Sequence, residues 1–586
     1  MMKCSISTIV GLTAWCLALS AVAVPVSAWE PNEKDLDIAI NRGDFSGYFA
    51  NVSAWLDQKT PSDPGKITEA AMAALVKEPV FRNALDQRRF METQSVAKLN
   101  DFAKVEAQRS FLAWVMKSTE RMDLYMEYAT PGIDALERWF KLYTEDLESR
   151  QGMYLRMAMA AALWPPGGVG QYRGSEAIEW QKRYNNFKTA HKNKDLVPSF
   201  DHLMVCDYGR CLNCIGADTD MNWARQMIHD WRPDLLEKEQ IHKIVSEVWR
   251  RWSPFGFTNG YITVMEGGGK CGPRGMFGQF VCNAMGVPAI GVGQPQHCTF
   301  AARCDYPETE PQAGSLWKVY QGRGWEFSDC GGCNGAQFTA QETLKYRTAE
   351  WSLVQHLNWL ASVLSSKERA AAVKALAVKV VKPVNTTHPM GVPASECDVV
   401  FFGKAAKADP AKKEAVIDYN AEGPPAATDA SNTASKPARV KEAPFKVAAG
   451  IIHVKADAFA KCFAEPAYPT EQDGQVFVFD AWTGGKQLYF QRNMKVSWAD
   501  YVIDVPEAGT YTLEVMLAAA NRDQVLQVSC GEEKLGTVKI PGTTGLWKKM
   551  EPVEVKLKKG TQTLRITSPS MQRGISIRWF ELIPKR

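Results

Sequence analysis

The chain has 586 residues, is 45% hydrophobic and 23% charged, and carries 69 Lys and Arg residues against 65 Asp and Glu residues. At roughly 150 residues per domain, this length predicts a multidomain protein with sizeable cores and excludes a wholly disordered chain or a disulfide-stapled miniprotein. The net charge of +4 is spread over the chain without a long basic run, which argues against nucleic acid as a partner.

The first 28 residues have the pattern of a secretory signal. Lys3 precedes an apolar stretch from Ile6 to about Val26, and the small residues Ser27 and Ala28 stand directly before Trp29. An uncleaved membrane anchor is the alternative, but the polar segment that follows at once favours cleavage. We therefore expect residues 1–28 to be a signal peptide and the mature protein to be secreted or periplasmic, with no later segment able to span a membrane.

The cysteines are consistent with such a destination. The chain has 14 cysteines, of which Cys4 and Cys16 lie in the predicted signal. Most of the others should be paired in an oxidising compartment. Cys462 and Cys530 stand apart near the C-terminal end and are candidates for a disulfide with each other. The even count leaves open whether one cysteine is a reactive thiol.

The pattern along the chain predicts two domains followed by a linker. Over residues 29–199, apolar residues recur at three- and four-residue spacing, as in Lys104–Met126 and Asp134–Met159, which predicts an α-helical domain. Residues 200–400 mix helical stretches with short strands and Gly/Pro turns. Residues 404–446 consist mainly of small and polar residues and are predicted to be a flexible linker.

Beyond the linker, short runs of alternating apolar residues are separated by turn signals. This pattern predicts an antiparallel β-sandwich over residues 447–586. The runs are Val476–Phe479, Tyr501–Val505, Tyr511–Leu517, Val525–Val528, Val553–Leu557, Thr563–Thr567 and Ile575–Leu582.

A candidate nucleophile stands in the middle of the chain. Cys271 follows a glycine triplet and directly precedes a predicted helix, Gly275–Met285. The unpaired amides and the positive dipole end of a helix start favour the thiolate, which is the nucleophilic form of sulfur. Lys270 and Arg274 act in the same direction. The competing interpretation is a half-cystine at a loop end, the commoner role of a cysteine in a secreted protein.

Two further residues could complete a catalytic arrangement around this thiol. His297 opens a predicted strand, and Asp329 ends a later strand in which it shares a face with Trp325 and Phe327. A thiol needs an imidazole to take its proton, and the imidazole needs a carboxylate to fix its tautomer. Cys271, His297 and Asp329 are therefore predicted to form a Cys-His-Asp triad.

In their order and spacing, these residues resemble the core of the transglutaminase-like superfamily. The matching pieces are Gly-x-Cys at a helix start, Gly286-Val287-Pro288-Ala289, His297 at a strand start and Gly324-Trp325-x-x-x-Asp329. The resemblance covers residues within Cys206–Ala340. It implies an α+β papain-like fold, with Cys271 as nucleophile, His297 as general base and Asp329 as orienting carboxylate. The family includes protein cross-linking enzymes, cysteine peptidases and peptide N-glycanases.

Two Cys-x-x-Cys motifs raise the question of a metal site. Cys211 with Cys214, and Cys330 with Cys333, could together bind zinc through four thiolates, as the paired motifs of peptide N-glycanases suggest. One pair precedes the predicted triad and the other follows it, and an exported chain more often oxidises such cysteines. We therefore expect disulfides there rather than zinc, and no required cofactor.

The C-terminal unit resembles the galactose-binding-like sandwiches of carbohydrate-binding module families 6 and 35. The matching motifs are Trp498-x-Asp500-Tyr501-x-x-Asp504-Val505-Pro506-x-x-Gly509-x-Tyr511, Thr544-Gly545-x-Trp547, Leu557-x-x-Gly560-x-x-Thr563-Leu564-Arg565 and Ile577-Arg578-Trp579. The resemblance implies a jelly-roll fold in which Trp547 would stack on a sugar ring, while Ser576 stands where the family has a sugar-bonding Asn. The alternative is that Trp547 is simply buried.

These features together predict a secreted cysteine enzyme. It would cleave or transfer an amide acyl group of a peptide, protein or glycopeptide, as a peptidase, amidase or transglutaminase does, and the sandwich would direct it to a glycan or polysaccharide. Two alternatives stay open. One is a catalytically inactive glycan- or protein-binding protein that uses the papain-like core as a scaffold, and the other is a peptide N-glycanase-like deglycosylase.

Overall fold

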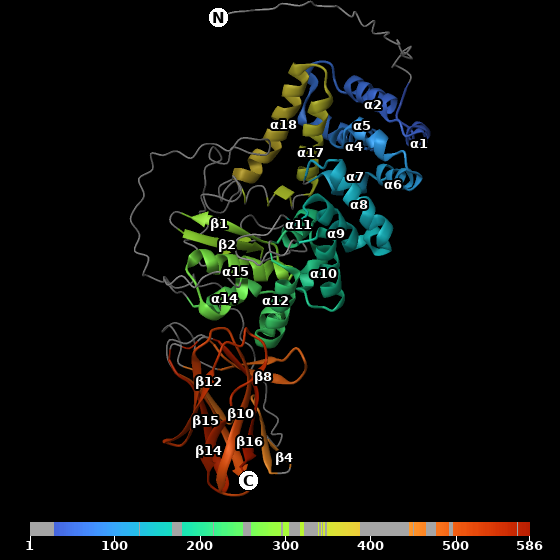
Figure 1. Ribbon diagram of the computed structural model, residues 1–586. Coiled ribbons are helices and arrows are strands. Elements are labelled where there is room, and N and C mark those ends of the chain that lie inside the picture. The colour runs from blue at the N-terminus through green and yellow to red at the C-terminus, as the bar shows by residue number, and fades with distance from the viewer. Residues whose placement is uncertain are drawn as a thin grey trace, which may run out of the picture. The chain divides into compact units, whose positions relative to one another are not determined.

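The structure is a computed structural model, in which the described residues form two compact units (Figure 1). One unit runs as far as Met122 and includes His356–Leu376, and the other comprises Asp123–Gln355 and Ala377–Arg586. The structure describes residues 29–585 except 128, 167–177, 215, 250–259, 295–296, 304–316, 321–337, 339–341, 343, 346–347, 387–444, 449, 465–475, 492–495, 571 and 573. The predicted signal peptide and nearly all of the predicted linker fall outside the described residues.

Helices build the first unit. They are α1 (Glu33–Arg42), α2 (Ser46–Lys59), the 3₁₀ turn η2 (Pro64–Lys66), α3 (Glu69–Lys77), α4 (Pro79–Gln94), α5 (Val96–Phe102), α6 (Glu106–Met116) and the start of α7 (Thr119–Met126), with parts of α17 (Thr348–Val363) and α18 (Lys367–Thr386). Polar side chains begin several of these helices. Asn32 caps α1 by accepting a hydrogen bond from the Asp35 amide, and Thr68 caps α3 through the Ala71 amide. The predicted helix Lys104–Met126 is two helices, because the chain breaks between α6 and α7.

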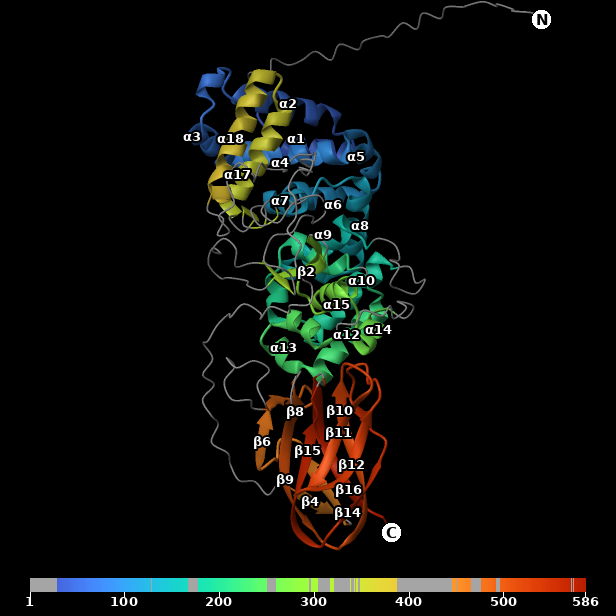
Figure 2. The ribbon, with the colours of Figure 1, turned by 90° about the vertical axis from the view of Figure 1, so that its left-hand side faces the viewer.

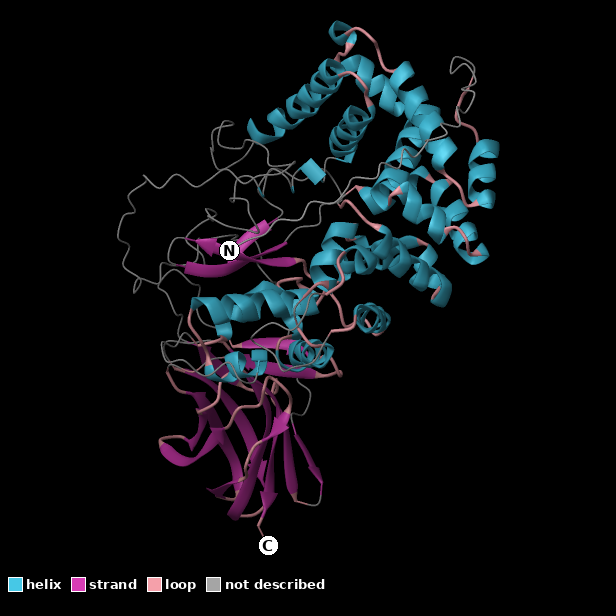
Figure 3. Ribbon diagram, turned by 45° about the horizontal axis from the view of Figure 1, so that its top comes forward, coloured by secondary structure: helices cyan, strands magenta, loops and turns pink. Residues whose placement is uncertain are grey.

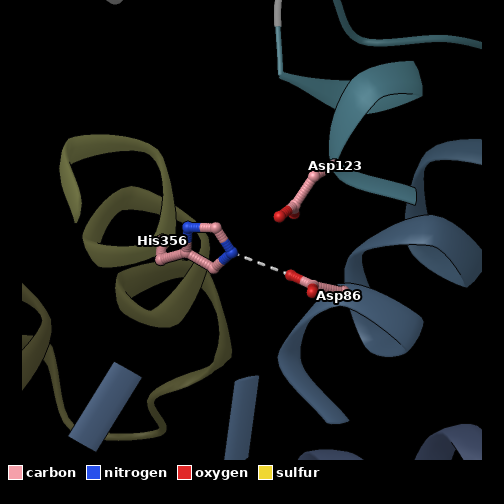
Figure 4. Close-up of side chains that lie close together, drawn as sticks. All are labelled: Asp86, Asp123 and His356. Atoms are coloured by element: carbon pink, nitrogen blue, oxygen red, sulfur yellow. Dashed lines mark hydrogen bonds and ion pairs between the residues drawn. The ribbon is translucent and has the colours of Figure 1, made fainter. Parts of the chain in front are cut away.

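The two late helices lie beside the N-terminal ones (Figure 2). His356 of α17 and Asp86 of α4 are both buried, and their Nε2 and Oδ1 atoms are 2.9 Å apart (Figure 4). The guanidinium of Arg369 donates to Asp57 Oδ1 at 2.7 Å and to the Thr60 carbonyl at 2.8 Å. The first unit is therefore discontinuous in sequence, and residues from the predicted catalytic domain, 200–400, complete it.

The second unit begins with helices, one of which packs directly on a small sheet. Its helices are the end of α7, then α8 (Ile133–Glu145), η3 (Leu147–Arg150), α9 (Gly152–Leu163), α10 (Trp180–Lys192), η4 (Pro198–His202), α11 (Val205–Leu212), α12 (Asp218–Trp231), α13 (Pro233–Glu237), η5 (Ile241–Glu247), α14 (Gly260–Gly267), α15 (Cys271–Ala284) and the start of α17. The antiparallel sheet has the order β1-β2-β3, formed by Ala289–Gln294, His297–Arg303 and Trp317–Tyr320. Among the described residues, none of the helices combines the length and apolar character needed to cross a bilayer.

Two antiparallel sheets form the sandwich, as the alternating runs predict (Figure 3). One contains β4 (Phe445–Ala448), β5 (Ile451–Lys455), β7 (Phe477–Asp480), β8 (Lys486–Phe490), β10 (Gly509–Ala519), β13 (Lys548–Lys549), β14 (Val553–Leu557) and β16 (Ile575–Pro584), and the other has the order β12-β11-β15-β9-β6. Those five strands are Glu533–Ile540, Gln524–Cys530, Gly560–Ser568, Ser497–Val505 and Lys461–Ala464. Alternate residues of β10, such as Leu513, Val515 and Leu517, enter the shared core.

The strand order contradicts the predicted disulfide between Cys462 and Cys530. Cys462 lies on β6 and Cys530 on β11, and the strands β9 and β15 separate them. Neighbouring strands are about 4.8 Å apart, so three such steps place the two Cα atoms roughly 14 Å apart. A disulfide requires a Cα separation below about 7 Å. The Cys530 thiol instead faces Gln562 Oε1 at 3.8 Å.

Candidate functional site

Cys271 is the first residue of α15, as its place in the sequence predicts. Its side chain is half-buried. One turn later, Arg274 is almost fully buried, and its guanidinium donates to the Val245 carbonyl of η5 at 3.3 Å. The candidate nucleophile thus begins a helix that is fixed to a neighbouring segment within one turn of the thiol.

Two glycines allow α15 to lie directly on β2. A Cβ atom added to Gly275 would stand 2.9 Å from the Thr299 Cα, and one added to Gly278 would overlap the ring of Phe300. Side chains at these positions would push the helix away from the strand. In contrast, a Cβ atom at Gly272 would meet no other atom within 4 Å. The close approach is therefore specific to one face of α15.

This packing brings the start of α15 level with the start of β2. From Gly275 back to Cys271 the helix descends about 6 Å, at about 1.5 Å per residue. From Thr299 back to His297 the strand covers about 6.6 Å, at about 3.3 Å per residue. The backbones of Cys271 and His297 consequently lie at the same end of the helix-on-sheet pair, as the predicted arrangement requires.

The direction of the His297 side chain is a separate matter. Phe300 packs against Gly278 and so projects towards α15. Side chains alternate along a strand, which places Cys298 on that same face and His297 on the other face with Thr299. The His297 backbone is thus level with Cys271, while strand alternation directs its Cβ atom to the face opposite Phe300.

A second imidazole lies on the side of the sheet that faces α15. Tyr320 pairs directly with Phe300 across β2 and β3, so the two rings share a face. The ring of His242, in η5, stacks on Tyr320 with centroids 3.9 Å apart. The sequence around His242 carries no motif that marks it, and its position becomes evident only in the fold.

Several predicted site residues fall outside the described residues. They are Asp329, the proposed orienting carboxylate, and Cys330 and Cys333 of the conceivable zinc site. Their possible partners Cys211 and Cys214 are buried. Burial raises the pKa of the Cys211 thiol well above its ordinary value, with the nearby Asp207 carboxylate adding to the effect. All eight cysteines within the described residues, Cys211 and Cys214 among them, are thiols outside any disulfide, which contradicts the expectation that most cysteines are paired and that Cys211 and Cys214 form disulfides. The zinc alternative stays untested, because Cys330 and Cys333 lie outside the described residues.

The loop before Cys271 is held by backbone contacts. Gly268 has φ of +77°, and a Cβ atom there would overlap the carbonyl of Trp249. The Gly269 amide donates to that same carbonyl at 2.9 Å. Glycine is needed at position 268 both for its left-handed backbone and for this close approach. The segment ending at Trp249 therefore sets the path of the chain into the candidate nucleophile.

The two residues proposed to bind sugar lie where the sandwich loops meet α12. Ser576 is fully buried, and its hydroxyl donates to the Trp231 carbonyl at 2.7 Å. The half-buried Trp547 donates its backbone amide to Asp230 Oδ2 at 3.1 Å. Ser576 thus makes its hydrogen bond within the chain, while part of the Trp547 side chain stays exposed.

The same edge of the sandwich contains a buried polar network, in which most groups are hydrogen-bonded and the Gln487 Oε1 atom is the exception. The guanidinium of Arg232 forms a two-point contact with Asp234, at 2.7 and 2.8 Å, and donates to Glu247 Oε1 at 3.2 Å. It also donates to the Tyr489 hydroxyl at 3.0 Å. Gln487 adds a fully buried amide that donates to the Trp231 carbonyl at 3.2 Å. Buried polar groups matched in this way are typical of a lasting internal interface.

Trp498 and Asp500, which begin the first of the sandwich motifs, both contact Arg565 of the neighbouring strand. Arg565 on β15 lies over the ring of Trp498 on β9, with its Cζ atom 3.7 Å from the ring centroid. The same guanidinium pairs with both carboxylate oxygens of Asp500, at 2.6 and 2.9 Å. These three residues connect neighbouring strands on one sheet face.

Comparison with known proteins shows that part of the chain is similar to carbohydrate-binding modules. No protein-family model matches the sequence, and no curated protein matches it. Among solved structures, the chain is similar to the C-terminal family 6 module of a marine laminarinase from Zobellia galactanivorans, with 21% identity, coverage of 23% of this chain and 98% of that one, and a TM-score of 0.19. A module of lichenase 5A from Cellvibrio mixtus, solved with cellotriose, is 19% identical to the chain. The match covers 23% of this chain and 97% of that module, with a TM-score of 0.19.

A family 35 carbohydrate-binding module from Clostridium thermocellum is also similar, with 12% identity, coverage of 23% of this chain and 100% of that one, and a TM-score of 0.18. Likeness at these TM-scores is too slight to support an argument about function. The assignment of a β-sandwich rests instead on the strand order, the register and the shared core.

Proposed function

We propose that the protein is a secreted or periplasmic cysteine enzyme of the transglutaminase-like type, which transfers or hydrolyses an amide acyl group of a peptide, protein or glycopeptide. One observation carries the proposal. Cys271 begins α15, and glycines at positions 275 and 278 pack this helix on the strand that His297 opens. A half-buried thiol at a helix start, level with an imidazole-bearing strand, has the main elements of cysteine acyl transfer.

The chemistry follows from these groups. A neighbouring imidazole takes the proton of the Cys271 thiol, and the sulfur attacks the amide carbonyl carbon. The tetrahedral intermediate collapses as the C–N bond breaks, the amine leaves with the proton from the imidazolium, and a thioester remains. Water or a second amine then attacks the thioester carbonyl and releases the sulfur, which gives hydrolysis or cross-linking.

The identity of the base is part of the proposal. His297 is the base that the resemblance implies, and its backbone is level with Cys271. His242 competes for the role, because its ring lies on the face of the sheet that α15 covers. A comparison of His297→Gln with His242→Gln separates the two assignments, since each substitution removes one imidazole and leaves a polar side chain.

An acyl-transfer test needs no knowledge of the natural substrate. We expect p-nitrophenyl acetate to acetylate Cys271 and release p-nitrophenolate, which intact-mass analysis and peptide mapping can follow. Cys271→Ser should abolish this adduct, and loss of the true base should slow its formation by about 10²-fold or more. Cys298→Ser is the matched control, because it removes a nearby exposed thiol without removing the helix-start cysteine. Acetylation that is unchanged in Cys271→Ser would refute the proposal.

The position of His297 on the far face of β2 favours a second candidate function. In this alternative, the papain-like part is a scaffold, and the protein binds a glycan or a protein without catalysis. It predicts that Cys271 reacts no faster than Cys298, and that neither histidine variant changes the rate. A peptide N-glycanase-like activity is tested separately, by release of the glycan from an N-glycosylated peptide.

A glycan-binding role of the sandwich is a further part of the proposal, and Trp547 is the residue that supports it. Its ring is half-buried, and its backbone is anchored to Asp230, so the side chain is held at the sandwich edge. Aromatic faces bind sugar rings by stacking, as they stack on other rings. Trp547→Ala should abolish binding on a glycan array and leave the thermal unfolding midpoint largely unchanged. A glycan array without a ligand for the unaltered protein would argue against this role.

A further inference from the structure

A buried asparagine in the sandwich contacts the segment that leads towards the candidate nucleophile. Asn521 follows β10, and its side chain is fully buried. Its Nδ2 atom donates to the Glu247 carbonyl at 2.9 Å, and its Oδ1 atom accepts from the Trp249 amide at 3.2 Å. One amide side chain therefore binds both a carbonyl and an N–H of the same short stretch, as a neighbouring strand would.

The contact continues towards Cys271 through one residue. Trp249, whose amide is bound by Asn521, presents its carbonyl to the Gly269 amide at 2.9 Å. Gly269 is two residues before Cys271. Asn521 is consequently linked to the loop that begins α15 by two successive hydrogen bonds and one intervening residue.

Other contacts hold the same segment from both sides. Gly574, in the loop before β16, donates its amide to Glu247 Oε2 at 3.2 Å. On the opposite side, Arg274 of α15 donates to the Val245 carbonyl. Residues 245–249, which we term the brace segment, thus lie between the sandwich loops and the helix that begins with Cys271.

We propose that Asn521 is a positioning residue, through which the sandwich fixes the brace segment and thereby the start of α15. The inference deepens the proposed function, on which its catalytic meaning rests. On this view the sandwich has a structural part in the candidate active site, in addition to any ligand that it binds. A loss of the Asn521 side chain should loosen the loop before Cys271 while the sandwich core keeps its strands.

Hydrogen exchange of the full chain, followed by mass spectrometry, tests this link. In Asn521→Ala, we expect the Gly269 amide to exchange at least about tenfold faster, because its acceptor Trp249 loses its anchor. Thr543→Val is the matched control. The Thr543 hydroxyl bonds the Ala519 amide and carbonyl, both at 2.9 Å, so its removal disturbs the same sandwich edge without touching residues 245–249.

Thiol alkylation by iodoacetamide gives a second readout that general destabilisation would not reproduce. Asn521→Ala should change the labelling rate of Cys271 by severalfold, while exposed Cys298 and buried Cys206 keep their rates. Asn521→Asp retains an acceptor for the Trp249 amide but loses the donor to the Glu247 carbonyl, so it should restore only part of the Gly269 protection. If Asn521→Ala does not fold, Asn521→Asp is compared with Thr543→Val instead. We then expect the Gly269 amide to exchange faster in Asn521→Asp than in the original protein, by less than about tenfold, and to be unchanged in Thr543→Val.

Equal exchange at Gly269 in the Asn521 variants and in Thr543→Val would overturn the inference. So would a rise in labelling of every cysteine together, since that reports general unfolding. Failure of the proposed function has a different signature. If Cys271 forms no acyl adduct yet Gly269 loses protection in Asn521→Ala, the positioning link stands and the catalytic proposal falls.

Discussion

Individual residues of the second unit differ sharply in their access to solvent, and the thiols show this most clearly. Cys298 is exposed and Cys271 is half-buried, whereas Cys206 and Cys211 are buried within α11. Burial, reinforced by the Asp207 carboxylate, raises the pKa of the Cys206 thiol to about 12. Labelling should therefore be concentrated at the exposed and half-buried thiols, which are Cys271 and Cys298 at the starts of α15 and β2 and Cys462 and Cys530 in the sandwich.

The first prediction concerns this contrast. At neutral pH, iodoacetamide should label Cys271 and Cys298 and leave Cys206 unmodified until the protein is denatured. With a thiol pKa near 12, the thiolate fraction of Cys206 is about a thousandfold below that of an ordinary thiol, and burial excludes the reagent as well. Peptide mapping after timed labelling measures the rates. Rapid native labelling of Cys206 would show that the interior around α11 opens readily.

Asp230 gives a second prediction at the residue scale. Burial raises the pKa of its carboxyl group, although the Trp547 amide and Gln226 side chain donate to it. The folded state therefore binds this proton more tightly than the unfolded state. The stability that the proton contributes is present in full below the unfolded pKa and is lost as the pH rises through the folded pKa. Asp230→Asn should unfold at an equal or higher temperature at pH 7, because Gln226 can reverse its amide to match the new side chain.

The advantage of Asp230→Asn should shrink as the pH falls through the folded pKa, where Asp230 itself becomes neutral. Thermal unfolding of both proteins at pH 7 and at about pH 4 measures the difference. A variant that is less stable than the original at pH 7 would mean that the ionised carboxylate contributes more through its hydrogen bonds than its burial costs.

At the scale of elements, the contact between α15 and β2 determines where the candidate nucleophile lies. Gly275→Ala and Gly278→Ala should each cost about 1–3 kcal/mol, because the new methyl groups force the helix away from Thr299 and Phe300. Gly272→Ala is the matched control on the same helix. It meets open space, and its better helix propensity should preserve or raise stability by up to about 1 kcal/mol.

Denaturant unfolding of the three glycine variants measures these costs, and acetylation of Cys271 reports the effect on the site. We expect Gly275→Ala to slow acetylation more than Gly272→Ala, although residue 272 is closer in sequence to the thiol. Similar stabilities for Gly275→Ala and Gly272→Ala would show that the helix can shift on the strand without penalty.

Sequence patterns predict these elements well where periodicity is regular. Each predicted sandwich run overlaps a strand of the structure, and Cys271 and His297 begin a helix and a strand as expected. The strand β8 escapes prediction because Gln487 to Phe490 are all buried and do not alternate. The predicted helix Lys104–Met126 conceals a break because the apolar spacing continues across it, and Ser118 is a weak mark of the new helix start.

The candidate site is less accessible to sequence reasoning than the elements are. Asn521 and Glu247 are 274 positions apart in the chain, and neither belongs to a motif that indicates contact. The resemblance predicts a sugar-binding role at Ser576, whereas its hydroxyl donates to the Trp231 carbonyl of α12 in the same chain. Such pairings depend on which surfaces meet in the fold, and local periodicity carries no information about that.

At the scale of the whole molecule, the contacts within the second unit predict that the sandwich stays bound after the linker is cut. Insertion of a protease site between residues 404 and 442, followed by cleavage, should leave both fragments together in size-exclusion chromatography. The Arg232 network and the Asn521 contacts hold the sandwich edge independently of the linker. An Arg232→Ala variant should weaken the association. Separation of the cut fragments of the unaltered protein would identify the sandwich as a freely tethered module.

The pair formed by Asp86 and His356 has a consequence for synthesis of the chain. These partners are 270 residues apart, and His356 leaves the ribosome only after nearly all of the helical part of the second unit has emerged. Until then, a carboxylate destined for the interior of the first unit lacks this imidazole, and the helices that receive α17 and α18 keep an uncovered apolar surface. The N-terminal helices therefore appear first but reach their final packing late, and a chain that stops before residue 356 should depend on chaperones and tend to aggregate.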